Sequence, residues 1–147
     1  MPDDLVVDKI RKSSHSEIWV TTKEYEGRPF CDIREYFYSS DGPQWLPTKK
    51  GVSIPRDFLG RAVDAVEELA SKNEVGEVAV LQRSKRQRIR FAIREYEKHV
   101  FGEIRIYYTE DPDGSDWKPG KGVTLPLALL GKLAEALKLA EDQMESG

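Results

Sequence analysis

Apolar and polar residues alternate with a period of two along two long stretches of the chain, residues 17–26 and 88–97. This alternation is typical of a strand that has one face on a core and the other in solvent. A tight connection follows each stretch, and the chain returns through a second stretch at residues 29–38 and 100–109. The pattern therefore predicts two antiparallel hairpins.

Each hairpin is flanked by shorter elements that complete a larger unit. A short strand pattern precedes it, at residues 5–11 and 78–82, and a turn-rich loop and another short strand follow it. Pro55 and Pro126 then suit the first turn of a helix, where the missing amide proton costs nothing. The sequence thus predicts an α+β fold made of two ββββα units.

The two predicted helices carry apolar residues at helical spacing. The first set is Phe58, Leu59, Ala62, Val63, Val66 and Leu69, and the second is Leu127, Leu130, Leu133, Ala134, Leu137 and Leu139. The second set covers a broader arc than one sheet face can bury, so we expect the two helices to touch each other. Gly60 and Gly131 stand at matching places and would permit a close approach.

The two units are copies of each other, because residues 5–72 recur as residues 76–143, displaced by 71 positions. A unit of roughly 70 residues forms only a marginal core. We therefore expect the units, 1–72 and 73–147, to pack as a pair. Such a duplication indicates either two binding surfaces or a dimer fused into one chain.

Composition excludes several classes of protein. With 39% hydrophobic and 33% charged residues, the chain has the balance of a soluble globular protein. It lacks both the ~20 apolar residues of a membrane span and the pattern of a secretory signal. We expect no membrane partner and a cytosolic location, at the nucleoid in a prokaryote or virus and in the nucleus in a eukaryote. The one cysteine, Cys31, lies in an apolar strand pattern, which predicts a reduced, buried thiol.

The sequence offers little support for catalysis. The two histidines, His15 and His99, stand at non-equivalent positions, and neither a glycine-rich phosphate loop nor the spacing of metal ligands is present. Asp32 and Glu35 are interpreted as surface charges of a strand. We therefore expect a protein that is not an enzyme and that uses no metal or cofactor.

Charge is unevenly distributed along the chain. The net charge of −3 argues against a nucleic-acid partner. Residues 78–94, however, hold six basic residues and no acidic one, whereas acids gather in the predicted helices. One positive surface is therefore compatible with acidic helices, and a solvated basic turn is the alternative.

Strand parity separates a helix-facing side from a solvent-facing side of each sheet. The predicted helix-facing residues are Ile18, Val20, Ile33, Ile89, Phe91, Ile93, Ile104 and Ile106. The opposite side alternates cations with rings: Trp19, Lys23, Tyr25, Arg34, Tyr36, Arg90, Arg94, Tyr96, Arg105 and Tyr107. Bases of a single strand stack on such rings while Arg and Lys meet the phosphates, whereas a duplex hides its bases. Cross-strand packing of the rings is the alternative interpretation.

The segments that carry these residues resemble the nucleic-acid-binding domain of the transcriptional coactivator p15 family, eukaryotic positive cofactor four. The matching segments are KEYEGRPFCDIREYFY and LPTKKGVSI in the first copy and REYEKHVFGEIRIYYT and WKPGKGVTL in the second. The resemblance implies curved antiparallel sheets of four strands, each backed by one helix, in an intramolecular pseudo-dimer with the helices at its interface. It also implies a sheet surface that binds single-stranded or melted DNA. The functional positions of the family fall on Lys23, Tyr25, Arg34, Phe37, Lys50, Arg94, Tyr96, Arg105, Tyr108 and Lys121.

Three features depart from the family pattern. Phe37 and Tyr108 fall by strict alternation on the helix-facing side, and only a bulge or bend would turn them toward nucleic acid. The basic loop differs between the copies, because Leu46 stands where the second copy has Lys118 and the second turn is one residue shorter. The first hairpin turn of each unit is longer than usual, and it is strongly basic in the second. The further basic candidates for the site are Arg28, Lys49 and Lys118.

The sequence therefore predicts a single-stranded DNA-binding protein that acts largely without sequence preference, in transcription or another DNA transaction. We expect a monomeric pseudo-dimer, and further self-association is left open. RNA binding, as an RNA chaperone, is one alternative. Another is a protein-interaction module whose sheet or acidic helices dock a transcription or replication protein.

Overall fold

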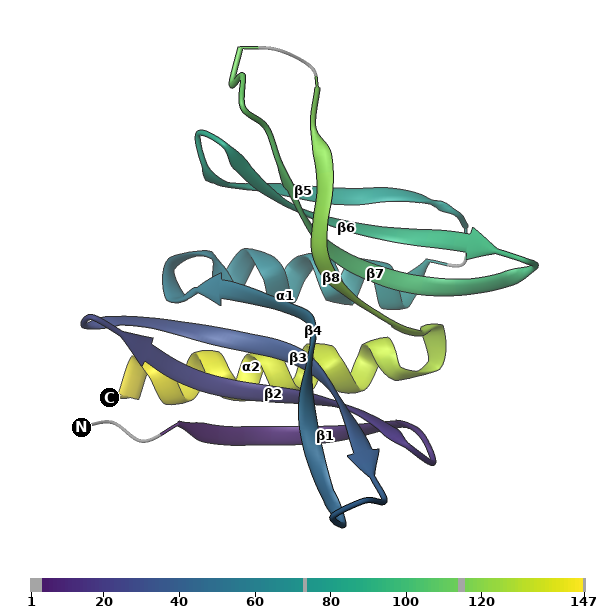
Figure 1. Ribbon diagram of the computed structural model, residues 1–147. Coiled ribbons are helices and arrows are strands. Elements are labelled where there is room, and N and C mark those ends of the chain that lie inside the picture. The colour runs from purple at the N-terminus through teal and green to yellow at the C-terminus, as the bar shows by residue number, and fades with distance from the viewer. Residues whose placement is uncertain (1–3, 73, 114–115, 147) are drawn as a thin grey trace.

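The computed structural model describes residues 4–72, 74–113 and 116–146. The first half holds β1 (Leu5–Ser13), β2 (Ser16–Tyr25), β3 (Arg28–Ser39), β4 (Gln44–Pro55) and α1 (Arg56–Ser71). The second half holds β5 (Gly76–Ser84), β6 (Gln87–Tyr96), β7 (His99–Tyr108), β8 (Lys118–Pro126), the 3₁₀ turn η1 (Leu127–Leu129) and α2 (Leu130–Ser146). The prediction of two ββββα units is confirmed (Figure 1). The expected unit boundary at residue 73 lies outside the described residues.

Each unit forms one antiparallel sheet with its strands in chain order, β1-β2-β3-β4 and β5-β6-β7-β8. The central hairpins pair β2 with β3 and β6 with β7 without a break in register. Glu26 and Gly27 close the first hairpin with two positive φ values, and Glu97 and Lys98 close the second in the same way. Such two-residue turns match the twist of the strands that they join.

The two helices lie side by side near the middle of the molecule and contact each other (Figure 1). Each helix also reaches the sheet of the other unit, because α1 contacts β5 and β6 while α2 contacts β1 and β2. Strands β4 and β8 meet as well. The two units therefore share one core, which confirms the intramolecular pseudo-dimer. Among the described residues, neither helix has the length and apolar character needed to cross a bilayer.

The predicted faces of the strands are confirmed in the core. Ile18, Val20 and Ile33 are fully buried, and so are four residues of the second unit: Ile89, Phe91, Ile93 and Ile104. Ile106 is partly buried and packs against the same core. The expectation for the helices needs two corrections. Leu139 is 51% exposed, because it lies on the side of α2 that neither sheet covers. A Cβ added at Gly131 would meet no atom within 4 Å, so this glycine does not serve a close helix approach, whereas one at Gly60 would lie 2.9 Å from the Glu141 carboxylate.

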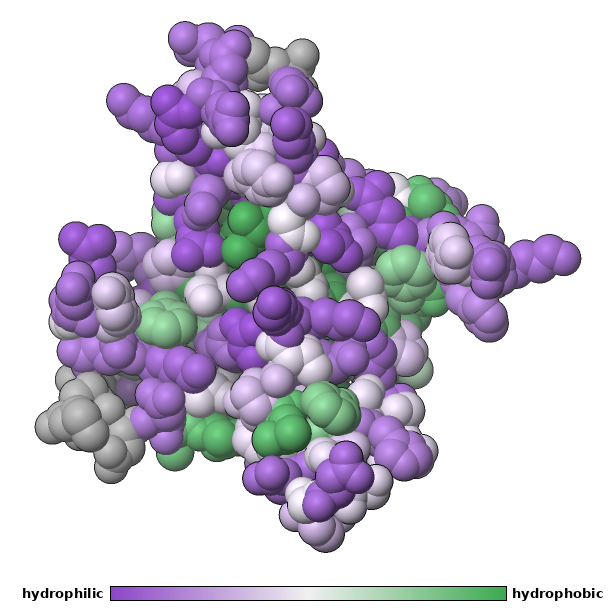
Figure 2. Space-filling model, in the orientation of Figure 1, coloured by the Kyte–Doolittle hydropathy of each residue, from purple (hydrophilic) through white to green (hydrophobic). Residues whose placement is uncertain are grey.

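The face of the molecule that Figure 2 shows is mainly hydrophilic. Hydrophilic side chains cover most of the face shown in Figure 2, and the hydrophobic ones appear there as small separate patches. Isolated exposed apolar residues are normal for a soluble protein. The visible face therefore suits a polar ligand better than a large apolar one.

Cys31 is fully buried in β3, as predicted. Burial, helped by the neighbouring carboxylate of Asp32, raises the pKa of this thiol to about 12 from its ordinary value of 9.0. Above pH 9 the unfolded chain loses a proton that the folded chain keeps. The contribution of this thiol to stability is therefore complete below pH 9 and decreases as the pH rises toward 12.

This pKa predicts an alkaline loss of stability that depends on one side chain. At pH 10 the thiol should lower the free energy of unfolding by about 1.4 kcal/mol relative to neutral pH. Denaturant unfolding of the wild type and of Cys31→Ala at pH 7 and pH 10 measures this effect, because other alkaline titrations act on both proteins. The wild type should lose more stability than the variant by about that amount. Equal losses in the two proteins would contradict a neutral buried thiol.

Candidate nucleic-acid interface

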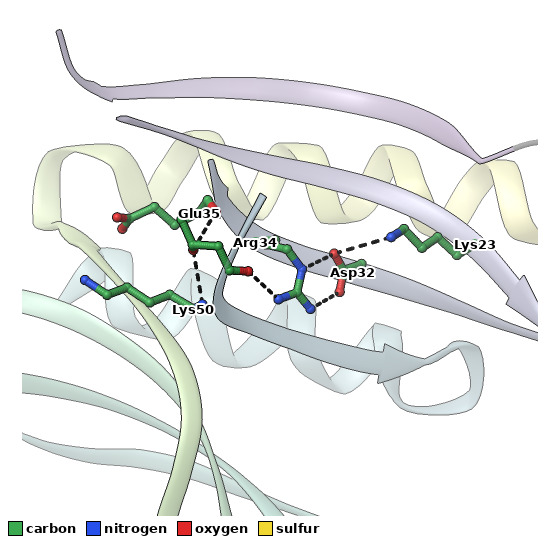
Figure 3. Close-up of polar contacts among 6 residues, drawn as sticks. Lys23, Asp32, Arg34, Glu35 and Lys50 are labelled. Atoms are coloured by element: carbon green, nitrogen blue, oxygen red, sulfur yellow. Dashed lines mark hydrogen bonds and ion pairs between the residues drawn. The ribbon is translucent and has the colours of Figure 1, made fainter. Parts of the chain in front are cut away.

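A cluster of opposite charges lies on the helix-free side of the first sheet (Figure 3). The two carboxylate oxygens of Asp32 accept hydrogen bonds of 3.0 Å from Nε and Nη2 of Arg34, and the Lys23 ammonium lies 3.9 Å away. Arg34 Nη1 also donates to the carbonyl of Thr48 at 2.9 Å. Asp32 is only 3% exposed. Its interpretation as a surface charge is wrong, because the two cations beside it on the same face cover it.

The second unit repeats this cluster with Glu103 as the acid. Its carboxylate lies 3.3 Å from Nε of Arg94 and 3.1 Å from Nη2 of Arg105. Arg105 Nη1 donates to the carbonyl of Gly120 at 2.8 Å. In both units the accepting carbonyl belongs to the residue after the proline of the turn. Each cluster holds two cations and one anion, so each leaves a positive charge on the sheet surface.

The glycine of each Lys-Gly turn lies where neighbouring atoms leave no room for a Cβ. A Cβ at Gly51 would come within 2.5 Å of the guanidinium carbon of Arg34. At Gly122 a Cβ would come within 2.6 Å of the carbonyl oxygen of Ile104, which is backbone and cannot swing away. These glycines are therefore part of the construction of the surface.

Three of the predicted rings, Trp19, Tyr36 and Tyr107, are already in contact with other side chains. Trp19 and Tyr36 stack with their ring centroids 3.8 Å apart and their planes 11° apart, and the Lys9 ammonium lies 4.1 Å from the centroid of Trp19. In the second unit the Arg90 guanidinium lies 4.1 Å from the centroid of the Tyr107 ring. These contacts fit the alternative interpretation, in which the rings pack against side chains of neighbouring strands. A base could stack on Trp19 only by displacing Tyr36 or Lys9.

Four other aromatic rings are open to solvent, in two matched pairs. Tyr25 and Tyr96 are each 68% exposed, and Phe37 and Tyr108 are each 43% exposed. Within the described part of the chain, none of the four makes a ring–ring or cation–ring contact. Rings that face water in both copies are available to stack on bases.

A bulge accompanies the exposure of Phe37 and Tyr108. In the first unit three residues of β4, 48–50, lie opposite one residue of β3. In the second unit two residues of β8, 120–121, lie opposite one residue of β7. Beyond the bulges the β3–β4 and β7–β8 tips bend away from the helices (Figure 1). No described helix therefore covers the side of the tips that strict alternation assigns to the core.

Two of the remaining predicted cations lie beside open rings on neighbouring strands. Arg28 pairs in register with Tyr25, and Lys118 pairs with Tyr108. The bulges hold three more exposed lysines: Lys49, Lys50 and Lys121. Figure 3 shows the Lys50 ammonium directed away from the ion cluster beside it. Exposed cations thus accompany an open ring at a hairpin end, Tyr25, and at a sheet tip, Tyr108.

Two tryptophans at the sheet tips, Trp45 and Trp117, escaped the sequence prediction. The Arg11 guanidinium lies 5.3 Å from the ring centroid of Trp45, and that of Arg88 lies 3.9 Å from the ring centroid of Trp117. The two tryptophans are 72 positions apart instead of 71, so their equivalence appears only after the shorter second turn is allowed for. The signal that could have found them is their place two residues before the turn proline in both units.

Comparison with known proteins connects both units to one family. A family model described as Transcriptional Coactivator p15 (PC4) matches residues 12–59 and 83–136. A Caenorhabditis elegans protein described as "Putative RNA polymerase II transcriptional coactivator" is 26% identical over 54 residues, which cover 37% of this chain and 44% of that protein. This chain thus matches less than half the length of that relative.

Solved structures of a PC4 homologue from Burkholderia pseudomallei also match. The orthorhombic crystal form is 26% identical, with a TM-score of 0.44, over 50% of this chain and 97% of that chain. The tetragonal crystal form is 27% identical, with a TM-score of 0.43, over 48% of this chain and 100% of that chain.

Proposed function

The chain belongs to the transcriptional coactivator p15 (PC4) family, and on this premise we propose that it binds single-stranded DNA across the helix-free sides of its two sheets and along the sheet tips that bend away from the helices. The observation that carries the proposal is the set of open rings that occur in matched pairs. Tyr25 has the same exposure as Tyr96, and Phe37 has the same exposure as Tyr108. Across neighbouring strands, Tyr25 pairs with Arg28 and Tyr108 pairs with Lys118.

The chemistry of this surface fits a flexible strand. Base stacking on an exposed aromatic ring contributes ~1–3 kcal/mol per base. Arg28 and Lys118 pair with Tyr25 and Tyr108, and Lys50 and Lys121 are exposed in the bulges, so these four cations can meet phosphates. Every base has a flat face, so binding of this kind has little sequence preference. A duplex keeps its bases stacked on one another and offers the rings nothing comparable.

Fluorescence anisotropy with a labelled dT oligomer and a duplex of equal length tests the proposal. We expect tighter binding to the single strand and a binding constant that falls with salt, with a log-log slope of about −0.7 for each phosphate contacted. Equal or tighter binding to the duplex, or binding that salt does not weaken, would contradict the proposal. Competition with an RNA oligomer of matched sequence separates DNA binding from RNA binding.

Docking of a transcription or replication protein is the second candidate, and the cleft between α1 and α2 favours it. Six acidic and three basic residues line this cleft, including Asp64, Glu67 and Glu141, so it would attract a basic partner. A pull-down before and after nuclease treatment distinguishes the two functions. A partner that survives nuclease and is lost with Asp64→Asn and Glu141→Gln would support docking.

A further inference from the structure

A cleft of about 470 Å³ lies where the two units meet, on the helix-free side of the first sheet. The first unit lines it chiefly with Tyr25, Arg28 and Phe30. The β5–β6 hairpin of the second unit lines it with Arg83, Ser84 and Gln87. The basic β5–β6 hairpin of the second unit therefore borders the ring-bearing face of the first. Its turn is only residues 85–86, shorter than predicted, because both strands extend further toward it. The volume of the cleft falls within the ~300–1,000 Å³ usual for small-molecule sites.

The β1–β2 hairpin makes the matching approach to the second sheet, but its cation is already paired. Lys12, the counterpart of Arg83, lies 2.7 Å from the carboxylate of Glu35 and 3.4 Å from the hydroxyl of Thr124. Lys12 thus holds a carboxylate of its own unit and a hydroxyl of the other. The counterpart of Glu35 in the second unit is Ile106, so this acid is missing from the surroundings of Arg83.

Arg83 is a cation with no anionic partner in the part of the chain that the structure describes. No hydrogen bond, ion pair or ring contact joins it to another described residue. The side chain is half-buried, and burial lowers the pKa of its guanidinium. An arginine nevertheless keeps its proton at neutral pH. A partly dehydrated positive charge attracts an anion more strongly than a fully hydrated one, because water screens it less.

We propose that this cleft binds one nucleotide of the bound single strand, with its phosphate between Arg83 and Arg28 and its base against the Tyr25 ring. The matching position at Lys12 does not take a nucleotide, because Glu35 already neutralises its cation. Gln87 and Ser84 add an amide and a hydroxyl that can hydrogen-bond a sugar or base edge. The proposal rests on the proposed function, and it makes the two halves of the chain unequal in binding.

Arg83→Gln and its matched control Lys12→Gln test the proposal in the full chain. With a dT oligomer, Arg83→Gln should weaken binding roughly tenfold, as expected for the loss of a charge-assisted hydrogen bond. The salt slope should become shallower by about 0.7, equivalent to one lost phosphate contact. Lys12→Gln should leave both quantities at the wild-type level. Equal thermal midpoints of wild type and Arg83→Gln exclude a structural cause, since Arg83 has no described partner to lose.

Photo-cross-linking locates the lost contact. A dT oligomer that carries 5-iodouracil should cross-link to peptides holding Tyr25 and Tyr96 in the wild type. Arg83→Gln should reduce the Tyr25 cross-link relative to the Tyr96 cross-link measured in the same sample, and Lys12→Gln should not. If Arg83→Gln changed neither the ratio of the two cross-links nor the affinity for the oligomer, the cleft would not bind a nucleotide. Single-strand binding itself would still stand. Failure of the wild-type protein to bind the oligomer would instead overturn the proposed function itself.

Discussion

Replacing both Tyr25 and Tyr96 with alanine is expected to weaken binding to a dT oligomer by roughly 5- to 150-fold for each ring, while the fold persists. Each ring is 68% exposed, so its removal leaves the shared core untouched. The loss reflects one stacking contact of ~1–3 kcal/mol at each position. Anisotropy titration gives the change in affinity, and thermal unfolding should show a melting temperature close to that of the wild type.

Two controls separate stacking from other consequences of these substitutions. Phenylalanine at both positions keeps a flat ring and removes only the hydroxyl, so binding should stay near the wild-type level. Leu139→Ala removes an exposed apolar side chain from α2, where no binding is proposed, and should change nothing. If the double alanine variant bound the oligomer as tightly as the wild type, the open rings would not be the stacking surface.

Arg34→Gln is expected to lower the free energy of unfolding by about 3–5 kcal/mol, the range observed when one partner of a buried ion pair is removed. The variant loses both hydrogen bonds to Asp32, whose side chain is 4% exposed. The only cation then left in the ion cluster beside the Asp32 carboxylate is Lys23, at 3.9 Å. Arg105→Gln should lower the free energy of unfolding by less than Arg34→Gln does. The side chain of Glu103 is more exposed, at 12%, and it also lies close to Arg94. Denaturant unfolding measures both losses.

The double variant Asp32→Ala with Arg34→Gln identifies the cause of the loss. If the cost arises from an uncompensated buried carboxylate, removal of that carboxylate should restore much of the stability lost in Arg34→Gln. A double variant as unstable as the sum of the two single variants would show that the carboxylate is not the cause. In that case the arginine would act mainly through its packing across Gly51 and its bond to Thr48.

The sequence predicts most of the fold because burial on one side of a strand acts on every second residue. Ile18 and Ile33 are buried and Tyr25 is open, as period-two alternation requires. The repeat strengthens the prediction, because the same apolar pattern occurs in both copies of each element although many of the side chains differ. The contact between the two helices also follows, since the apolar arc of the second helix is too broad for one sheet.

Alternation assigns a residue to a face, but it does not say what else occupies that face. Asp32 is on the predicted side and is nevertheless buried, because Lys23 and Arg34 fold over it. Trp19 is also on the predicted side, yet Tyr36 and Lys9 occupy it. Such coverage depends on side-chain length and charge in neighbouring strands, which a periodic pattern does not contain.

The sequence does not predict the other contacts between the units, for a different reason. The reach of α2 to β1 and β2, and of Arg83 to the cleft beside Tyr25, depends on how the two copies are placed in space. No local pattern fixes that placement. The equivalence of Trp45 and Trp117 was hidden by a single-residue difference in turn length.

In our proposal, a single strand lies on the rings that the helices leave uncovered. Side-chain NMR of the aromatic ring protons during titration with a dT oligomer tests it most directly. We predict shifts at Tyr25, Phe37, Tyr96 and Tyr108 that saturate together, with little change in the methyl groups of α1 and α2. Ring signals that stay in place while the oligomer is fully bound, or shifts confined to the two helices, would contradict the claim.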